Sequence, residues 1–370
     1  CEGLVLVFRH IFKPRNVVCN AEKNPFKIKK TKSMKKIITT TILFCLLVNF
    51  ANGQENEYKT IEKNTMEGTK VGVTKNGKEI IPAEYDALGE YSSGKFVALK
   101  NQKVGVIDTL NKTVIPFKYS FITNFIGDRT FLAENEKLAM ADDKGNILTK
   151  FEFDEVLGYE NGIARILKDN KVGYVDKTGK MIIQPKFNEG YDCFGNFILV
   201  YTSSWKSLGY QYVQKDFFGN VLDQGDVGMS GKLPILFSKK GEILYKGQFG
   251  EKIKITPNEK LAVSDRYLEM GTRESKIIDS NGKILHQFDG PTSVSIENEW
   301  IRVSTNTGSG YKVGIIDFNG KEALKQNFSD ISNYRFNNGT LAKVKFPNGA
   351  FFYINKNVEC VEFEGQSCPE

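Results

Sequence analysis

The chain has 370 residues, a formal net charge of +7, 40% hydrophobic residues and 26% charged residues. This hydrophobic fraction is typical of folded domains and excludes a wholly disordered chain. Two His and six Cys argue against a His-rich metal site and a dense disulfide framework, whereas 34 Gly favour strands joined by tight turns.

The first 53 residues carry the pattern of an exported protein. Met34 is followed by two lysines, an apolar stretch over Ile37–Phe50 and the small residues Ala51-Asn52-Gly53. A basic start, a short apolar run and small residues at the end are typical of a secretory signal peptide. The run is shorter than the roughly 20 residues of a membrane-spanning helix. We therefore expect a signal peptide over 34–53, no membrane span in the mature chain, and an upstream extension over 1–33 that the mature protein lacks.

Removing this segment changes the interpretation of the charge. Residues 1–53 hold ten of the 51 Lys and Arg but only two of the 44 Asp and Glu, so the remaining chain has 41 basic and 42 acidic residues and a formal charge of −1. A near-neutral chain lacks the basic surface that binds phosphate backbones. We therefore expect no nucleic-acid partner.

The rest of the chain repeats with a period near 34 residues. The sequence Lys-Val-Gly starts at Lys70, Lys103, Lys171 and Lys312. The expected turn residues, each 34 apart, are Gly77, Asn111, Gly145 and Gly179. Gly and Asn are the residues that best tolerate a positive φ, so these positions predict left-handed turns between strands. Eight residues after each turn comes an aromatic residue: Tyr85, Tyr119, Phe153 and Phe187, with Phe328 at the same spacing from Gly320.

Each unit therefore reads as three short strands joined by polar or Gly turns, with the last strand closed by Pro and followed by an aromatic residue. The short periods and frequent turns predict an all-β fold of tandem antiparallel hairpins, arranged as a curved solenoid-like array or, alternatively, a β-propeller. We expect a linker over 54–68, about eight units over 69–360 that are degenerate in 202–311, and a C-terminal tail over 361–370.

The unit resembles the WG-repeat family. The closest stretches are KVGYVDKTGKMIIQPKFN at 171–188 and KVGIIDFNGKEALKQNFSD at 312–330. The family's Asp position is occupied by Asp108, Asp176 and Asp317, whereas its signature Trp is replaced by Val71, Val104, Val172 and Val313. The resemblance implies an all-β repeat array without established enzymatic activity, often exported by bacteria. Family properties that depend on the indole ring of this Trp are therefore not expected for this chain.

The repeated residues have a structural and a functional interpretation. The aromatic column fits sheet-to-sheet packing better than a stacking platform for sugars. The Asp column fits capping of its own turn better than calcium binding, because no unit has a dense acidic loop.

Several single residues also stand out. Trp205 lies in a polar segment that we expect to be irregular. The sequence favours equally two roles for this residue, in a recognition loop or packed back over the sheet. Cys360 and Cys368 are close enough in sequence to form a disulfide in an exported chain. Cys193 is expected to be a buried thiol, since His286 is the sole imidazole after residue 53 and lies in another repeat.

Motifs for catalysis are missing from the sequence. It has no Gly-x-Ser-x-Gly, His-Glu-x-x-His or phosphate-binding Gly-x-x-x-x-Gly-Lys-Ser/Thr motif. We therefore assign no catalytic, cofactor-binding or metal-binding residue. The leading hypothesis is a secreted or envelope-located, non-catalytic scaffold that binds a protein or surface glycan near Trp205 and Trp300. The alternative is a carbohydrate-active enzyme with acidic residues from different repeats, since two carboxylates suffice for that chemistry.

Overall fold

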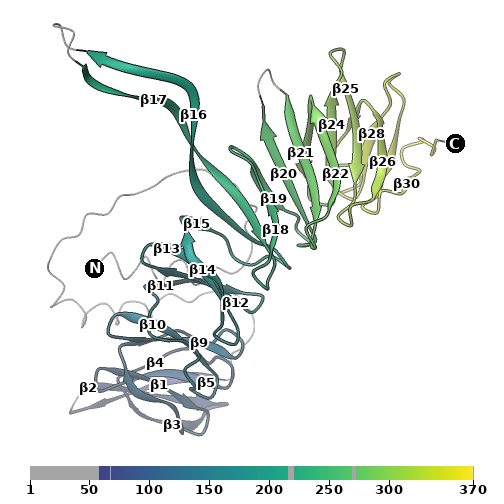
Figure 1. Ribbon diagram of the computed structural model, residues 1–370. Coiled ribbons are helices and arrows are strands. Elements are labelled where there is room, and N and C mark those ends of the chain that lie inside the picture. The colour runs from purple at the N-terminus through teal and green to yellow at the C-terminus, as the bar shows by residue number, and fades with distance from the viewer. Residues whose placement is uncertain (1–57, 67, 216–220, 269–271, 370) are drawn as a thin grey trace. The chain divides into compact units, whose positions relative to one another are not determined.

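The computed structural model describes residues 58–66, 68–215, 221–268 and 272–369 (Figure 1). These residues form strands and turns without a helix in any of the four ranges, in agreement with the all-β prediction. Within them, no helix is long and apolar enough to cross a membrane. The expected upstream extension and signal peptide lie outside the described residues.

The chain divides into two compact units, Cys1–Phe151 and Glu152–Glu370. The first unit contains three antiparallel sheets with the orders β1-β2-β3, β4-β5-β6-β7 and β10-β9-β8. Its strands are β1 (Tyr58–Thr65), β2 (Gly68–Lys75), β3 (Lys78–Tyr85), β4 (Ala87–Leu88), β5 (Lys95–Lys100), β6 (Lys103–Asp108), β7 (Thr113–Tyr119), β8 (Phe121–Ile122), β9 (Arg129–Glu134) and β10 (Lys137–Asp142). Strand β1 occupies much of the segment expected as a linker.

The second unit contains five four-stranded antiparallel sheets, each built from four consecutive strands: β11–β14, β15–β18, β19–β22, β23–β26 and β27–β30. The strands are β11 (Glu155–Glu160), β12 (Ile163–Lys168), β13 (Lys171–Asp176), β14 (Met181–Phe187), β15 (Glu189–Gly190), β16 (Ile198–Lys215), β17 (Val221–Phe237), β18 (Ile243–Lys246), β19 (Lys252–Ile255), β20 (Leu261–Tyr267), β21 (Arg273–Asp279), β22 (Ile284–Gly290), β23 (Thr292–Ile296), β24 (Ile301–Asn306), β25 (Tyr311–Ile316), β26 (Glu322–Phe328), β27 (Asp330–Ile331), β28 (Ala342–Lys345), β29 (Phe351–Ile354) and β30 (Cys360–Val361). A disulfide joins Cys360 in β30 to Cys368.

The repeated turn has the backbone conformation that the sequence predicted. The φ angles are 77° at Gly77, 62° at Asn111, 88° at Gly145 and 88° at Gly179. All four lie in the left-handed region, which Gly and Asn occupy at the lowest cost. The 34-residue spacing of Gly and Asn therefore follows from the positive φ that each hairpin turn requires.

The glycine of each Lys-Val-Gly sequence serves a different purpose, because the third strand of the unit bulges over it. In the β2–β3 pair, Val71 lies opposite Tyr85 and Val73 opposite Ile81, which leaves extra residues around Pro82. A Cβ at Gly72 would lie 2.5 Å from the carbonyl oxygen of Ile81. The strand therefore does not end at the proline, as the sequence pattern suggested, but continues through a bulge where the missing N–H is tolerated.

The sheet β10-β9-β8 shows what happens without this glycine. Ala139 stands at the corresponding place in β10, and the sheet has three strands. The chain after β10 makes isolated contacts in place of a fourth strand: Leu148 N donates to Met140 O at 2.8 Å, and Thr149 Oγ1 accepts from Met140 N at 2.9 Å. A methyl group at position 139 occupies the space that a bulged strand needs.

The core lies between consecutive sheets. One buried cluster joins Val73 and Ile81 of the first sheet to Phe96 and Ile107 of the second. In the second unit, another cluster joins Tyr174 and its neighbours in β11–β14 to residues of β15–β18, and the pattern continues to the last sheet. Each sheet thus buries its faces against its neighbours within a unit, which is the packing of a repeat array.

Candidate functional site

The strands β16 and β17 form a hairpin that extends well past the rest of their sheet (Figure 1). Strand β15 pairs only with Val200 and Tyr201, and β18 pairs only with residues 235–237. Residues 203–215 and 221–233, called the arm below, therefore form a two-stranded ribbon in the described part of the chain. Thirteen residues in a strand span roughly 40 Å.

The arm corrects the expectation for Trp205. The residue lies within a continuous strand and not in an irregular segment, and its side chain is 52% exposed. Sequence periodicity could not show this strand, because both faces of a two-stranded ribbon meet solvent and no alternation of burial is imposed. Other exposed apolar residues of the arm are Tyr212, Val213, Val221 and Met229.

Aromatic rings cover the glycines of the arm. Gly225, Gly228 and Gly231 follow one another at intervals of three in β17. The ring atoms nearest to where a Cβ would stand belong to Tyr212 at Gly225, to Trp205 at Gly228 and to Phe249 at Gly231. Such cross-strand covering compensates for the weak strand-forming tendency of glycine. Trp205 thus stabilises the ribbon with one face and offers the rest of its ring to solvent.

The loop Gly247–Glu251, called the base loop, supports the arm where it leaves the sheet. Gly247 N donates to Pro234 O at 2.8 Å, and Gly250 N donates to Lys232 O at 3.3 Å. Together with the Phe249 ring over Gly231, these bonds hold the loop against β17. The base loop thus continues the β17 edge beyond the short strand β18.

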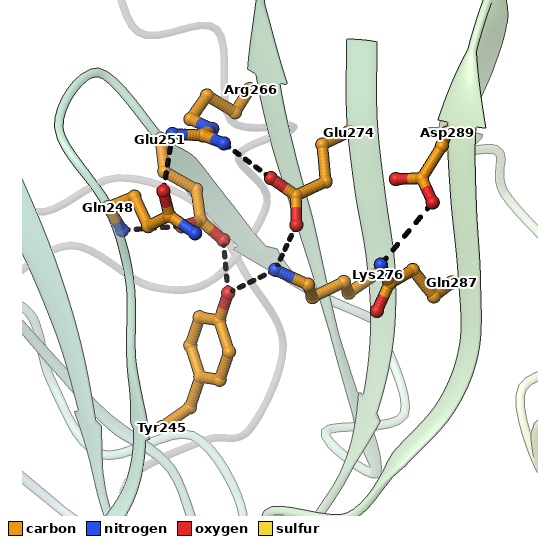
Figure 2. Close-up of polar contacts among 8 residues, drawn as sticks. All are labelled: Tyr245, Gln248, Glu251, Arg266, Glu274, Lys276, Gln287 and Asp289. Carbon is orange, nitrogen blue, oxygen red and sulfur yellow. Dashed lines mark hydrogen bonds and ion pairs between the residues drawn. The ribbon is translucent and has the colours of Figure 1, made fainter.

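A closed ring of polar contacts, called the polar ring, anchors the other side of the base loop (Figure 2). Lys276 Nζ donates to Glu274 Oε1 at 2.6 Å and to the Tyr245 hydroxyl at 3.1 Å, and that hydroxyl donates to Glu251 Oε1 at 2.7 Å. The remaining contacts are Gln248 N to Glu251 Oε2 at 2.6 Å, Arg266 to Gln248 Oε1 at 2.5 Å and Arg266 to Glu274 Oε2 at 2.6 Å.

The charges of the polar ring are balanced and mutually stabilised. The hydrogen bond from Lys276 is the main reason that the pKa of Glu274 is lowered. Burial disfavours the Lys276 ammonium, but its bonds to Glu274 and Tyr245 outweigh that effect and raise its pKa. Burial, followed by the bond to Glu251, raises the pKa of Tyr245. These three pKa shifts favour a charged Glu274, a charged Lys276 and a neutral Tyr245, which is a structural arrangement and not that of a general acid or base.

Lys276 stands where other units have the repeat glycine. It lies six residues before Gly282, as Gly314 lies six residues before Gly320. In β25–β26 the register shifts around Gly314, whereas Lys276 lies directly opposite Gln287 in an unshifted part of β21–β22. A side chain fits here because no bulged strand crosses above it. The turn spacing was the sequence signal that could have revealed this residue.

The repeated residues singled out from sequence are structural. The aromatic column is buried, as predicted: Tyr85, Tyr119, Phe153, Phe187 and Phe328. The Asp column caps its own turns, also as predicted, because Oδ1 accepts the backbone N–H groups two and four residues later at Asp108, Asp176 and Asp317.

Trp300 does not offer a binding surface, contrary to the sequence hypothesis. Its side chain is 2% exposed, and its ring centroid lies 4.6 Å from that of Tyr334. Burial among residues of the last two sheets explains this position. Of the two tryptophans, Trp205 alone is exposed.

Cys193 and His286 lie in separate surroundings. Cys193 is a free, buried thiol whose pKa burial raises to about 11, so it is held as an unreactive thiol at neutral pH. His286 Nε2 lies 2.7 Å from the carbonyl oxygen of Gly320 and lines a cavity of about 100 Å³ with Phe288 and Leu324. Among the residues that the structure describes, no three His, Cys, Asp or Glu side chains are grouped to hold a metal ion.

The sequence matches a family model described as "WG containing repeat" in four consecutive segments, at residues 73–103, 105–137, 140–171 and 173–201. Residues 73–201 are tandem WG repeats. The matched segments correspond to the sheets that carry the 34-residue period, and the match ends just before the arm begins. No curated protein is similar enough in sequence to match.

Solved structures align with this chain at low sequence identity and low TM-scores. A crystal structure of the eukaryotic initiation factor aligns with 82% of this chain and 95% of its own, at 10% identity and a TM-score of 0.30. Dipeptidyl peptidase 4 of Porphyromonas gingivalis aligns with 76% of this chain and 55% of its own, at 9% identity and a TM-score of 0.29. The WD40 β-propeller domain of Doa1 aligns with 59% of this chain and 90% of its own, at 13% identity and a TM-score of 0.20. The chain spans about half the length of the peptidase.

Proposed function

We propose that this protein is an exported, non-catalytic scaffold whose arm binds a protein partner. The observation that carries the proposal is the arm itself, a two-stranded ribbon with Trp205 half exposed near its middle. A ribbon of two strands is marginally stable in water and gains most from added contacts. Exposed Trp and Tyr are the residues that most often anchor protein interfaces.

The rest of the molecule supports a scaffold role. Sheets stacked through apolar clusters give the arm a rigid base, and the polar ring fixes the base loop against it. Every Asp or Glu with a resolved shift among the described residues has a lowered pKa: Glu84, Asp86, Asp142, Asp176, Glu189 and Glu274. A glycosidase acid needs the opposite shift, so these carboxylates favour binding over catalysis.

Replacing residues 205–230 by Asn-Gly tests the role of the arm. Ser204 lies opposite Gly231, so a two-residue turn closes the shortened hairpin and leaves the sheet intact. We expect partner binding, measured by pulldown of surface and secreted proteins followed by titration of the purified partner, to be lost. Trp205→Ala should weaken binding about tenfold or more, as for an interface anchor, while the equally exposed Tyr311→Ala in β25 should leave it unchanged. Binding of purified polysaccharides alone would overturn the proposal.

Export is tested separately. Expression of the chain from Met34 should yield a processed protein outside the cytoplasm whose N-terminus is Gln54, as measured by intact mass and terminal sequencing. Retention of the whole leader in the cytoplasm would contradict the exported location without bearing on the arm.

A further inference from the structure

The outer edge of β16 in the arm is an open strand edge. Beyond Tyr201, β16 has β17 as its sole strand partner in the described chain. On the other side of the arm, the base loop already donates hydrogen bonds to Pro234 and Lys232 of β17. A strand edge without a neighbour presents a row of backbone donors and acceptors to any extended segment.

The two edges differ in how they resist a further strand. Strand β17 carries Pro234, three glycines and the exposed acid Asp226, all of which disfavour strand addition. Strand β16 has no proline and no acidic residue over its 18 residues, and its charged residues are Lys206 and Lys215. Lys206, whose side chain is exposed, disfavours a basic neighbour and favours an acidic one.

We propose that the partner adds an extended, acidic segment as a third strand along the outer edge of β16. This proposal rests on the proposed function and specifies its mode of binding. Backbone hydrogen bonds to β16 supply affinity, and the exposed Lys206 selects acidic side chains. An added third strand gives β16 a neighbour on both sides and so stabilises the arm, which is marginally stable as a two-stranded ribbon.

The register shows which backbone groups face this edge. Pro234 accepts from the base loop, so its carbonyl points away from β16. The register shift between Ser207 and Tyr210 places its extra residues in β16, so β17 keeps its alternation and every second residue as far as Gln224 faces the same way as Pro234. In an antiparallel pair, directly opposed residues both point inward or both point outward. Val213 lies opposite Gln224, so the Val213 N–H points to the open edge.

Because Val213 and Gln224 lie opposite each other and face opposite edges of the arm, they offer two matched variants. Val213→Pro removes an outward donor of β16 and blocks addition there, whereas Gln224→Pro makes the same change at the opposite edge. Neither removes a hydrogen bond between β16 and β17, so the arm keeps its ladder. Thermal unfolding and Trp205 emission of both variants check that the arm is intact.

The first probe is an acidic peptide of about ten residues that alternates Glu with Val and Thr, with a Lys-containing peptide of the same length as its counterpart. Fluorescence anisotropy with the full chain should show binding of the acidic peptide that weakens with salt. Val213→Pro should weaken it about tenfold or more, as should Lys206→Glu, while Gln224→Pro stays within about twofold. A peptide that does not bind, or that binds Val213→Pro equally, overturns the proposal.

The partner found by pulldown separates this inference from the proposed function. If deletion of the arm abolishes partner binding but Val213→Pro does not, the arm binds by a face and the edge proposal is wrong. If the deletion leaves binding intact, the proposed function itself is wrong. A dimer of the chain that Val213→Pro dissociates, measured by light scattering, would assign the edge to a second copy and overturn the acidic partner.

Discussion

Gly72→Ala is expected to lower the free energy of unfolding of the first unit by about 2–3 kcal/mol, the cost of forcing extra atoms into a packed site. The added Cβ would lie 2.5 Å from the carbonyl oxygen of Ile81 and 2.7 Å from the amide nitrogen of Ala83. Both neighbours are backbone atoms of the bulged strand β3, which cannot move without breaking its pairing with β2. Urea denaturation measures the change.

The control is Gly89→Ala in the same unit. A Cβ there would meet its nearest atom at 3.4 Å, an ordinary contact, and the residue is not among the glycines with positive φ. Stability should change by less than about 0.5 kcal/mol, as at sites without a specific constraint. Equal losses in the two variants would show that glycine flexibility, and not the close strand, determines the repeat position.

Lys276→Met is expected to destabilise the second unit by about 2–3 kcal/mol, because it removes charged hydrogen bonds from a buried group. Lys276 is 7% exposed and contacts both Glu274 and Tyr245. Its loss leaves Glu274 with Arg266 alone and removes a donor from the tyrosine hydroxyl. The exposed Lys254→Met in β19 is the matched control and should be nearly neutral.

The pH dependence of stability gives a second measure of the polar ring. The pKa of Glu274 is lowered from 4.5, so its contribution is present at neutral pH and lost as the pH falls below that value. The pKa of Lys276 is raised from 10.5, so its contribution is present below that value and lost as the pH rises above it. Lys276→Met should flatten the alkaline loss. A variant that keeps the wild-type pH profile would show that the ring adds no stability.

The glycine and lysine predictions concern the same position of the repeat. In four units a bulged strand covers it and permits no side chain, as at Gly72 and Gly314. In β21 the pairing at Lys276 lies before the register shift, and the lysine reaches from this position into the polar ring. The replacement of glycine by lysine at this position turns a packing site into a hydrogen-bonding site that connects the base of the arm to the next sheet.

The sequence determined the elements whose geometry is local. A positive φ admits few residues, so the spacing of Gly77, Asn111, Gly145 and Gly179 identified the turns, and the buried aromatic column followed from the same period. The Asp caps were predictable for the same reason, since each acts within four residues of chain. Period and turn chemistry were enough to predict an all-β repeat protein.

Only the tertiary structure decided the features that depend on residues far apart. Trp205 and Trp300 have similar sequence surroundings of polar residues, yet one lies on a solvated ribbon and the other between packed sheets. The polar ring joins Tyr245 to Lys276 across two sheets, a contact that no local pattern encodes. Local backbone preferences are written in each residue, whereas burial and the availability of a strand edge depend on which other segments arrive beside it.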